Sequence, residues 1–155
     1  MKNSTGILVL FMILMSCNSG EKKNDAYSAV PKTEKAKDHP GKTLMETNCY
    51  ICHSPTATQD ARIGPPMIAI KKHYINDTIT KEAFVAALQA WIKNPNAEDV
   101  KMFGAVKRFG VMPKQAFPEA IITQIAEYMY DFEIEQPIWF ETHFKKQKGK
   151  SEKKF

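Results

Sequence analysis

The sequence of 155 residues lacks two patterns that would define its fold and location directly. No segment shows the alternation of apolar and polar residues that is typical of a half-buried strand, so the sequence predicts an all-α domain. No apolar run reaches the roughly 20 residues that a transmembrane helix needs. The run from Ile7 to Met15 is too short to cross a bilayer, and it suits a signal peptide instead.

The residues around this run favour export. Lys2 precedes it, and residues 14–17 (Leu-Met-Ser-Cys) resemble a bacterial lipobox, in which the cysteine becomes the acylated first residue of the mature protein. We therefore expect residues 1–16 to be a lipoprotein signal peptide. The mature protein would be exported and anchored by a lipid on Cys17 to a membrane of the cell envelope, on its periplasmic side. An ordinary signal peptide with a chance cysteine is the alternative.

Cysteine is scarce, with three residues in the whole chain. If Cys17 carries a lipid, Cys49 and Cys52 remain, and no thiol is left over in an oxidising compartment. These two lie in Cys49-Tyr50-Ile51-Cys52-His53, which sets two thiols one helical turn apart with an imidazole directly after the second.

This motif has three possible uses. A thioredoxin-like redox pair needs a βαβ setting, which the absence of strand patterns excludes. A zinc site needs a second pair of ligands, and no two of the remaining histidines (His39, His73 and His143) form a local pair. Covalent haem attachment uses all three residues, because the thiols form thioethers with the haem vinyl groups and His53 binds the iron. The sequence therefore predicts one covalent haem c.

The sixth position on the iron is open to several candidates. Met112 is favoured because Pro113 follows it, and proline pushes the preceding residue into an extended conformation that can hold a thioether in place. Met102 lies in a possible helix with no local feature that directs it. His73, or a position without any protein ligand, also stays possible.

The centre of the chain has no large excess of positive or of negative charge. The net charge is +5, but residues 39–137 carry ten basic and eleven acidic side chains. The excess lies in six lysines between positions 145 and 154, so we expect no nucleic-acid partner. These lysines predict a solvated tail, with a docking arm for an acidic partner or anionic lipid as the alternative.

The segments between these features divide the chain into four parts. Residues 17–38 are rich in polar and charged side chains and are expected to form a flexible tether. Residues 39–133 form the domain, and residues 134–155 form a Lys-rich extension that either packs as an extra helix or docks a partner. Within the domain we expect mostly loop over residues 54–75.

Three helices are expected in the domain, with a fourth short one. The first begins at Pro40, the second follows an N-cap at Thr80 and ends before Pro95, and the last begins at Pro118. Residues 100–111 are expected to hold one or two further helical turns. Met129 lies on the apolar stripe of the last helix and is expected to fill the core.

The order of these motifs resembles that of a monohaem class I cytochrome c, over roughly residues 40–132. The resemblance rests on the Cys-x-x-Cys-His motif, Gly64-Pro65, Trp91-Ile92 with Asn94-Pro95, Met112-Pro113 and the closing helix with Tyr128. It implies a cytochrome c-like fold, a small helical bundle around the covalent haem.

The resemblance also assigns supporting roles. Pro65 would offer its carbonyl to His53, Trp91 would pack near a haem propionate or simply fill the core, and Gly41 would allow the first and last helices to cross closely. Met45 departs from the pattern because an aromatic residue is usual at its position.

With His53 and Met112 both bound, the iron would have no vacancy for a substrate. We therefore expect an electron carrier or electron-transfer subunit rather than an enzyme, cycling between ferrous and ferric states by outer-sphere transfer. Its partners would be redox proteins such as a membrane oxidase, reductase or dehydrogenase, and we expect no small-molecule substrate. The alternative is a haem-based sensor or small-gas-binding domain with a weak or open sixth ligand.

Overall fold

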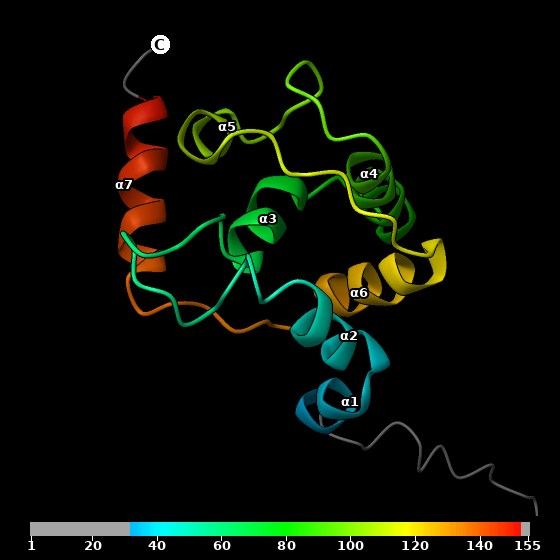
Figure 1. Cartoon of the computed structure of the whole chain (residues 1–155). Helices are drawn as coiled ribbons and strands as arrows, with labels where there is room; N and C mark the ends of the chain where they lie inside the picture. Colours follow the sequence, from blue (N-terminus) through cyan, green and yellow to red (C-terminus); the bar gives the residue numbers. More distant parts are fainter. Residues whose placement is uncertain (1–31, 153–155) are drawn as a thin grey trace, which may run out of the picture.

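The structure, a computed structural model, describes residues 32–152, with the side chains of residues 35–149. This part of the chain consists of helices joined by turns and loops, without a strand, which confirms the all-α prediction (Figure 1). The helices are α1 (Lys32–Asp38), α2 (Pro40–Asn48), α3 (Met67–Tyr74), α4 (Lys81–Lys93), α5 (Phe103–Phe109), α6 (Glu119–Asp131) and α7 (Phe140–Glu152). None of these helices has the length and apolar character needed to cross a membrane. The predicted signal peptide, the lipid site at Cys17 and most of the tether lie outside the described residues.

The helix boundaries predicted from caps and prolines are confirmed. Helix α2 begins at Pro40, α6 follows Pro118, and α5 occupies the segment around Gly104. Helix α4 begins after Thr80, whose side-chain oxygen accepts a hydrogen bond from the backbone N–H of Ala83 at 3.2 Å. Such a cap satisfies one of the backbone donors that the first turn of a helix leaves unpaired.

Replacing Thr80 with alanine removes this cap acceptor. We expect the free energy of unfolding to fall by about 1 kcal/mol, the usual cost of losing a threonine or serine cap. Thermal or denaturant unfolding measures the change, with Thr78→Ala in the preceding turn as a control for a threonine that does not cap α4. An equal loss in both variants would contradict the capping role.

The prediction that residues 54–75 are mostly loop is wrong for the second part of that segment. Residues 67–74, expected to be loop, form α3, whose side chains Met67, Ile68, Ala69 and Tyr74 are buried. A short helix with so much of its surface inside the protein shows little apolar periodicity, which is why the pattern did not indicate it. Figure 1 shows α3 at the centre of the view.

The tether prediction is wrong for its last residues. Residues 32–38 form α1, and Ala36 packs against the hydrophobic core. This segment is rich in lysine and also contains alanine and glutamate, which favour helix formation. Described helical structure is therefore already present before the domain boundary expected at residue 39.

Helices α2 and α6 cross at Gly41. A Cβ atom added to Gly41 would collide with the backbone carbonyl of Gln124 and lie 2.7 Å from the Cβ of Tyr128, so only glycine permits this approach. Met45, one turn further along α2, is fully buried. The close approach shows that methionine at this position does not loosen the crossing.

An aromatic contact at the crossing comes from an unexpected residue. His39 caps α2, with its Nδ1 accepting a hydrogen bond from the N–H of Gly41 at 3.1 Å. Its ring also lies between two rings at the end of α6, 5.7 Å from Tyr128 and 5.6 Å from Phe132 between centroids. A histidine therefore supplies a ring contact at the α2–α6 crossing.

Helix α4 packs beside α6 and is tied to it by polar contacts at both ends. Lys81 forms an ion pair with Asp131 at 2.6 Å, and the side-chain amide of Gln89 donates to the hydroxyl of Thr123 at 2.9 Å. Between these contacts lies the hydrophobic core, in which Phe84 and Met129 are fully buried. The expectation that Met129 fills the core is confirmed.

The extension after residue 133 packs on the domain as an extra helix. Phe140 at the start of α7 is 2% exposed, and Phe144 one turn later packs against the core. The indole N–H of Trp139 donates to the carbonyl of Ala57 at 2.9 Å, which joins the extension to the loop that follows the Cys-x-x-Cys-His motif. Of the two possibilities left open by the sequence, the structure has the packed helix.

Candidate functional site

The two thiols and the imidazole lie on one turn of chain that continues from α2. The N–H of Cys49 bonds to the carbonyl of Met45, and the N–H groups of Cys52 and His53 bond to the carbonyl of Cys49 at 3.2 and 2.8 Å. This turn fixes the spacing of the two sulfur-bearing residues and places His53 next to them. Cys49 and Cys52 are both free thiols rather than a disulfide.

The imidazole of His53 has a fixed tautomer. Its Nδ1 lies 2.6 Å from the carbonyl oxygen of Pro65, and a carbonyl can only accept, so Nδ1 carries the proton. The lone pair on Nε2 is then available to a metal ion. The contact expected between Pro65 and His53 is present, whereas its effect on a bound metal stays a prediction.

Gly64 makes room for this hydrogen bond. A Cβ atom at this position would lie 3.0 Å from the carbonyl oxygen of Cys52 and 3.3 Å from Nδ1 of His53. The N–H of Met67 also reaches back to the carbonyl of His53 at 3.4 Å. The Gly64-Pro65 segment therefore folds directly onto the turn that carries the motif, so it is not a bare turn.

Burial shifts the pKa values of His53 and Cys49. It lowers the pKa of His53 from its ordinary value, and the hydrogen bond to Pro65 offsets this only in part, so the imidazole is neutral at pH 7. Burial, with a smaller contribution from Cys52, raises the pKa of Cys49 to about 11. Reactive redox cysteines have a lowered thiol pKa, and the shift at Cys49 is in the opposite direction.

The candidates for the sixth ligand lie in different surroundings. Met112 is half-buried in the segment without regular secondary structure between α5 and α6, and Gly110, with φ of +80°, allows the chain to turn out of α5 toward it. Met102 precedes α5 and packs against the core. His73 is exposed on α3, where its Nδ1 contacts the carbonyl of Ala69 at 2.7 Å and its ring packs edge-on against Phe144.

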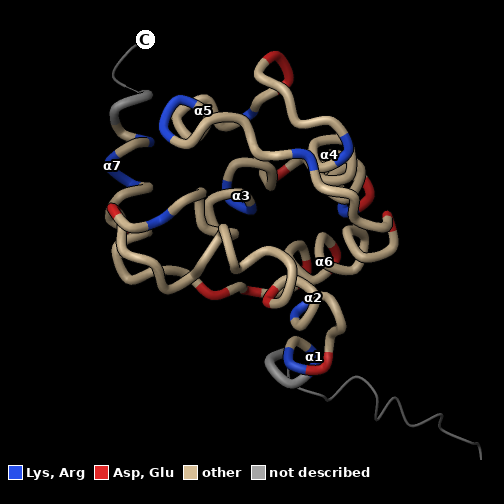
Figure 2. Tube along the Cα trace, in the orientation of Figure 1, with Lys and Arg blue, Asp and Glu red and all other residues tan. Residues whose placement is uncertain are grey.

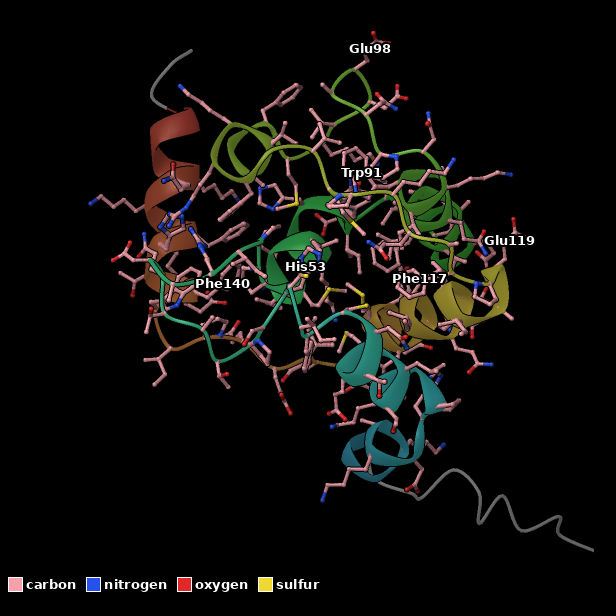
Figure 3. All side chains as sticks on the ribbon, in the orientation of Figure 1. His53, Trp91, Glu98, Phe117, Glu119 and Phe140 are labelled. Carbon is pink, nitrogen blue, oxygen red and sulfur yellow. The ribbon has the colours of Figure 1, made fainter. Side chains whose placement is uncertain are left out.

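Trp91 lies on α4 and is half-buried outside the hydrophobic core. Its indole N–H forms no hydrogen bond with any residue from 35 to 149. In Figure 3 His53 is labelled near the middle of the view, with Trp91 above it and Phe117 to its right. The structure thus brings Cys49, Cys52, His53 and Pro65 into direct contact, whereas Met112 and Trp91 have no bonded contact with them.

Other arrangements in the described residues do not compete with this site. Within residues 35–149 no three His, Cys, Asp or Glu side chains lie close enough together to hold a metal ion. A surface groove of about 500 Å³ lies between α4 and the segment before α6, with Lys93, Lys114 and Phe117 among its lining residues. None of the predicted site residues lines this groove.

Comparison with protein-family models, curated proteins and solved structures gives no significant match to this chain. Sequence reasoning missed two functional contacts, the cap and ring contacts of His39 and the stacking of Arg62 beside Trp139. A histidine directly before Pro40 was a usable signal for the cap, because the residue before a helix-starting proline is the N-cap. No local signal pointed to the Arg62 contact, since its partners lie far along the chain.

Proposed function

We propose that this chain is an electron-transferring c-type cytochrome with one covalent haem in a cytochrome c-like fold. The observation that carries the proposal is the hydrogen bond from Nδ1 of His53 to Pro65, beside two unpaired thiols on the same turn. A neutral imidazole with Nε2 free and two free thiols are the groups that haem attachment of this kind requires.

These residues fit a haem in chemistry and in order. Cys49 and Cys52 would form the two thioethers, and His53 would bind the iron through Nε2 while Pro65 holds the ring orientation. When bound, the haem would supply reversible one-electron exchange between ferrous and ferric iron. The burial of His53 keeps its imidazole neutral and therefore able to act as a ligand.

Met112 is the proposed sixth ligand. It lies outside the helices, in a segment that Gly110 separates from α5, whereas Met102 packs against the core and His73 is hydrogen-bonded within its own helix. A thioether opposite an imidazole favours electron transfer and raises the reduction potential. Trp91, with its indole N–H unbonded, is a further candidate to contact the haem through a propionate.

The α2–α6 crossing supports the cytochrome c-like fold. Gly41 permits contact between the first and last domain helices, which is the arrangement that the family resemblance implies. We further propose that the protein is exported and held at the cell envelope by a lipid on Cys17. Electrons would then pass by outer-sphere transfer to and from redox partner proteins such as a membrane oxidase, reductase or dehydrogenase.

A reduced-minus-oxidised absorption spectrum of the exported protein tests this function. We expect the sharp reduced bands of a c-type haem, with colour that remains on the protein after extraction with acidified acetone. A colourless matured protein would overturn the proposal. A ferric protein without the far-red sulfur-to-iron band, which binds carbon monoxide readily when reduced, would favour the haem-based sensor instead.

Replacing Met112 with alanine is expected to leave the haem attached but to open one side of the iron. The potential should fall by roughly 0.1–0.3 V, within the roughly 0.8 V range that axial ligands set. Redox titration and carbon monoxide binding measure the two effects. Met102→Ala is the matched control and should change the potential little, so a larger drop in that variant would show that Met102 is the ligand.

A further inference from the structure

One side of the molecule carries basic side chains from three separate segments. Arg62 comes from the segment before α3, Arg108 from α5, and His143 and Lys146 from α7. We call these four residues the basic cluster. Figure 2 shows α5 and α7 on the same side of the view, each with lysine or arginine along it.

Arg62 is the most unusual member, because it is held by rings and not by an acid. Its guanidinium carbon lies 4.6 Å from the ring centroid of Trp139 and 5.3 Å from that of Phe109. It forms no hydrogen bond or close ion pair with any residue from 35 to 149. Five N–H donors on a half-buried cation are therefore unused, which is costly unless a ligand or solvent satisfies them.

The terminal amino groups of Arg62, unlike its Nε, are the atoms that a ligand would contact. Among the described side chains, its Nε is the one nitrogen or oxygen atom that is buried without a hydrogen-bond partner. The two terminal amino groups also have no partner in the described residues, so they must be accessible from outside. The guanidinium thus presents its pair of terminal donors at the surface, in the fork geometry that binds oxyanions.

Arg108 brings a second guanidinium to the same place. It lies 5.1 Å from the ring of Phe109 that Arg62 also faces, and it donates to the carbonyl of Gln59 at 2.8 Å. The nearest carboxylate, that of Asp60, is 3.9 Å away on a side chain that is 100% exposed. Such an exposed contact compensates little of the charge.

His143 lies in the field of these cations. The amide nitrogen of Gln59 contacts its Nδ1 at 3.2 Å, and its ring packs against Trp139. Burial lowers the pKa of His143, and Arg62, Arg108 and Lys146 lower it further. Burial and Arg108 lower the pKa of Arg62, and Asp60 offsets this only in part, so the positive charges of Arg62 and Arg108 repel each other.

We propose that the basic cluster is a binding site for a phosphate oxyanion, taken either as free inorganic phosphate or as part of a lipid headgroup. A phosphate matches the fork of a guanidinium and offers enough oxygens to bond Arg62 and Arg108 together. Either source offers more oxygens than a single carboxylate, and the second charge of inorganic phosphate further suits a site with several cations. None of the four residues belongs to the Cys-x-x-Cys-His motif, so phosphate binding can be measured separately from haem attachment.

Titration calorimetry of the purified full mature protein with inorganic phosphate, at ionic strength held constant with chloride, tests the proposal. We expect saturable binding at one site. Arg108→Gln should weaken it by at least about tenfold, since hydrogen bonds to charged groups are the strong ones. Lys107→Gln removes the same charge from the neighbouring position of α5 and should weaken it less than about twofold.

A second variant distinguishes weaker phosphate binding from loss of folding. Arg62→Lys keeps the charge and most of the stem but loses the fork, so it should weaken phosphate binding while the unfolding temperature stays close to that of the wild type. Phosphate that binds no more tightly than chloride, or equal weakening in Lys107→Gln and Arg108→Gln, would overturn the site. Acetate binding as tightly as phosphate would also overturn it.

Comparing inorganic phosphate with glycerophosphoglycerol distinguishes free phosphate from a lipid headgroup as the ligand. Glycerophosphoglycerol is a phosphodiester and represents the headgroup of an anionic lipid without its acyl chains. Tighter binding of inorganic phosphate would identify free phosphate as the ligand. Binding of the diester at least as tightly would identify a lipid headgroup, and either result supports the site.

Discussion

Changing both Cys49 and Cys52 to alanine is expected to yield a chain with no covalently attached haem. The reason is chemical, because each thioether needs one of these sulfurs and the described residues contain no other cysteine. The backbone turn from Cys49 to His53 depends on backbone hydrogen bonds, so His53 and its contact with Pro65 should remain. Any haem in this variant would be held only by iron ligation.

Acidified acetone separates the two cases, because it extracts haem that is bound without a covalent link. We expect all pigment of the double variant in the organic phase, and all pigment of the wild type on the protein. Each single variant should keep one thioether and retain part of its pigment. Ser54→Ala, directly after the motif, is the control and should behave as the wild type. Pigment that stays on the double variant would contradict the assignment of both cysteines.

Replacing Gly41 with alanine is expected to give the largest loss of stability. The added Cβ would meet the backbone carbonyl of Gln124 and the Cβ of Tyr128 at 2.7 Å. Backbone atoms cannot rotate away, so α2 and α6 would have to move apart and the packing around Met45 would open. We expect the free energy of unfolding to fall by about 3 kcal/mol or more, at the upper end of the usual range for overpacking.

Thermal unfolding measures this effect, and a loss of that size lowers the unfolding temperature by about 10 °C in a domain of this length. Gly104→Ala is the matched control, because Gly104 lies in α5 with nothing within 4 Å of an added Cβ. That variant should be unchanged or slightly more stable, since alanine favours a helix over glycine. Equal stability of Gly41→Ala and the wild type would show that the helices do not depend on this contact.

The helices that the sequence predicted correctly share a local signal. Thr80 caps α4 through its own side chain, and Pro40 and Pro118 mark the starts of α2 and α6. These signals act over a few residues, so they are readable without knowledge of the fold. Helix α3 had no such signal, because Pro66 forms no side-chain cap and its buried residues show little periodicity.

The candidate site also has features that were readable from the sequence and features that were not. The identities and spacing of Cys49, Cys52 and His53 were readable from the chain, because the motif occupies a single turn. The tautomer of His53 was not readable, since it depends on where the carbonyl of Pro65 lies, 12 residues further on. The position of Met112 relative to His53 is a still longer-range property, which is why several candidates for the sixth ligand stayed open.

The sequence by itself determined the all-α class, the helix starts and the chemistry offered by the Cys-x-x-Cys-His motif, because each depends on neighbours along the chain. Only the tertiary structure decided that α7 packs on the domain, that His39 supplies a ring at the α2–α6 crossing, and that Arg62 stacks on Trp139 without an acid. These contacts join residues that lie about 80 or more positions apart, and no local pattern encodes which distant surfaces exclude water together.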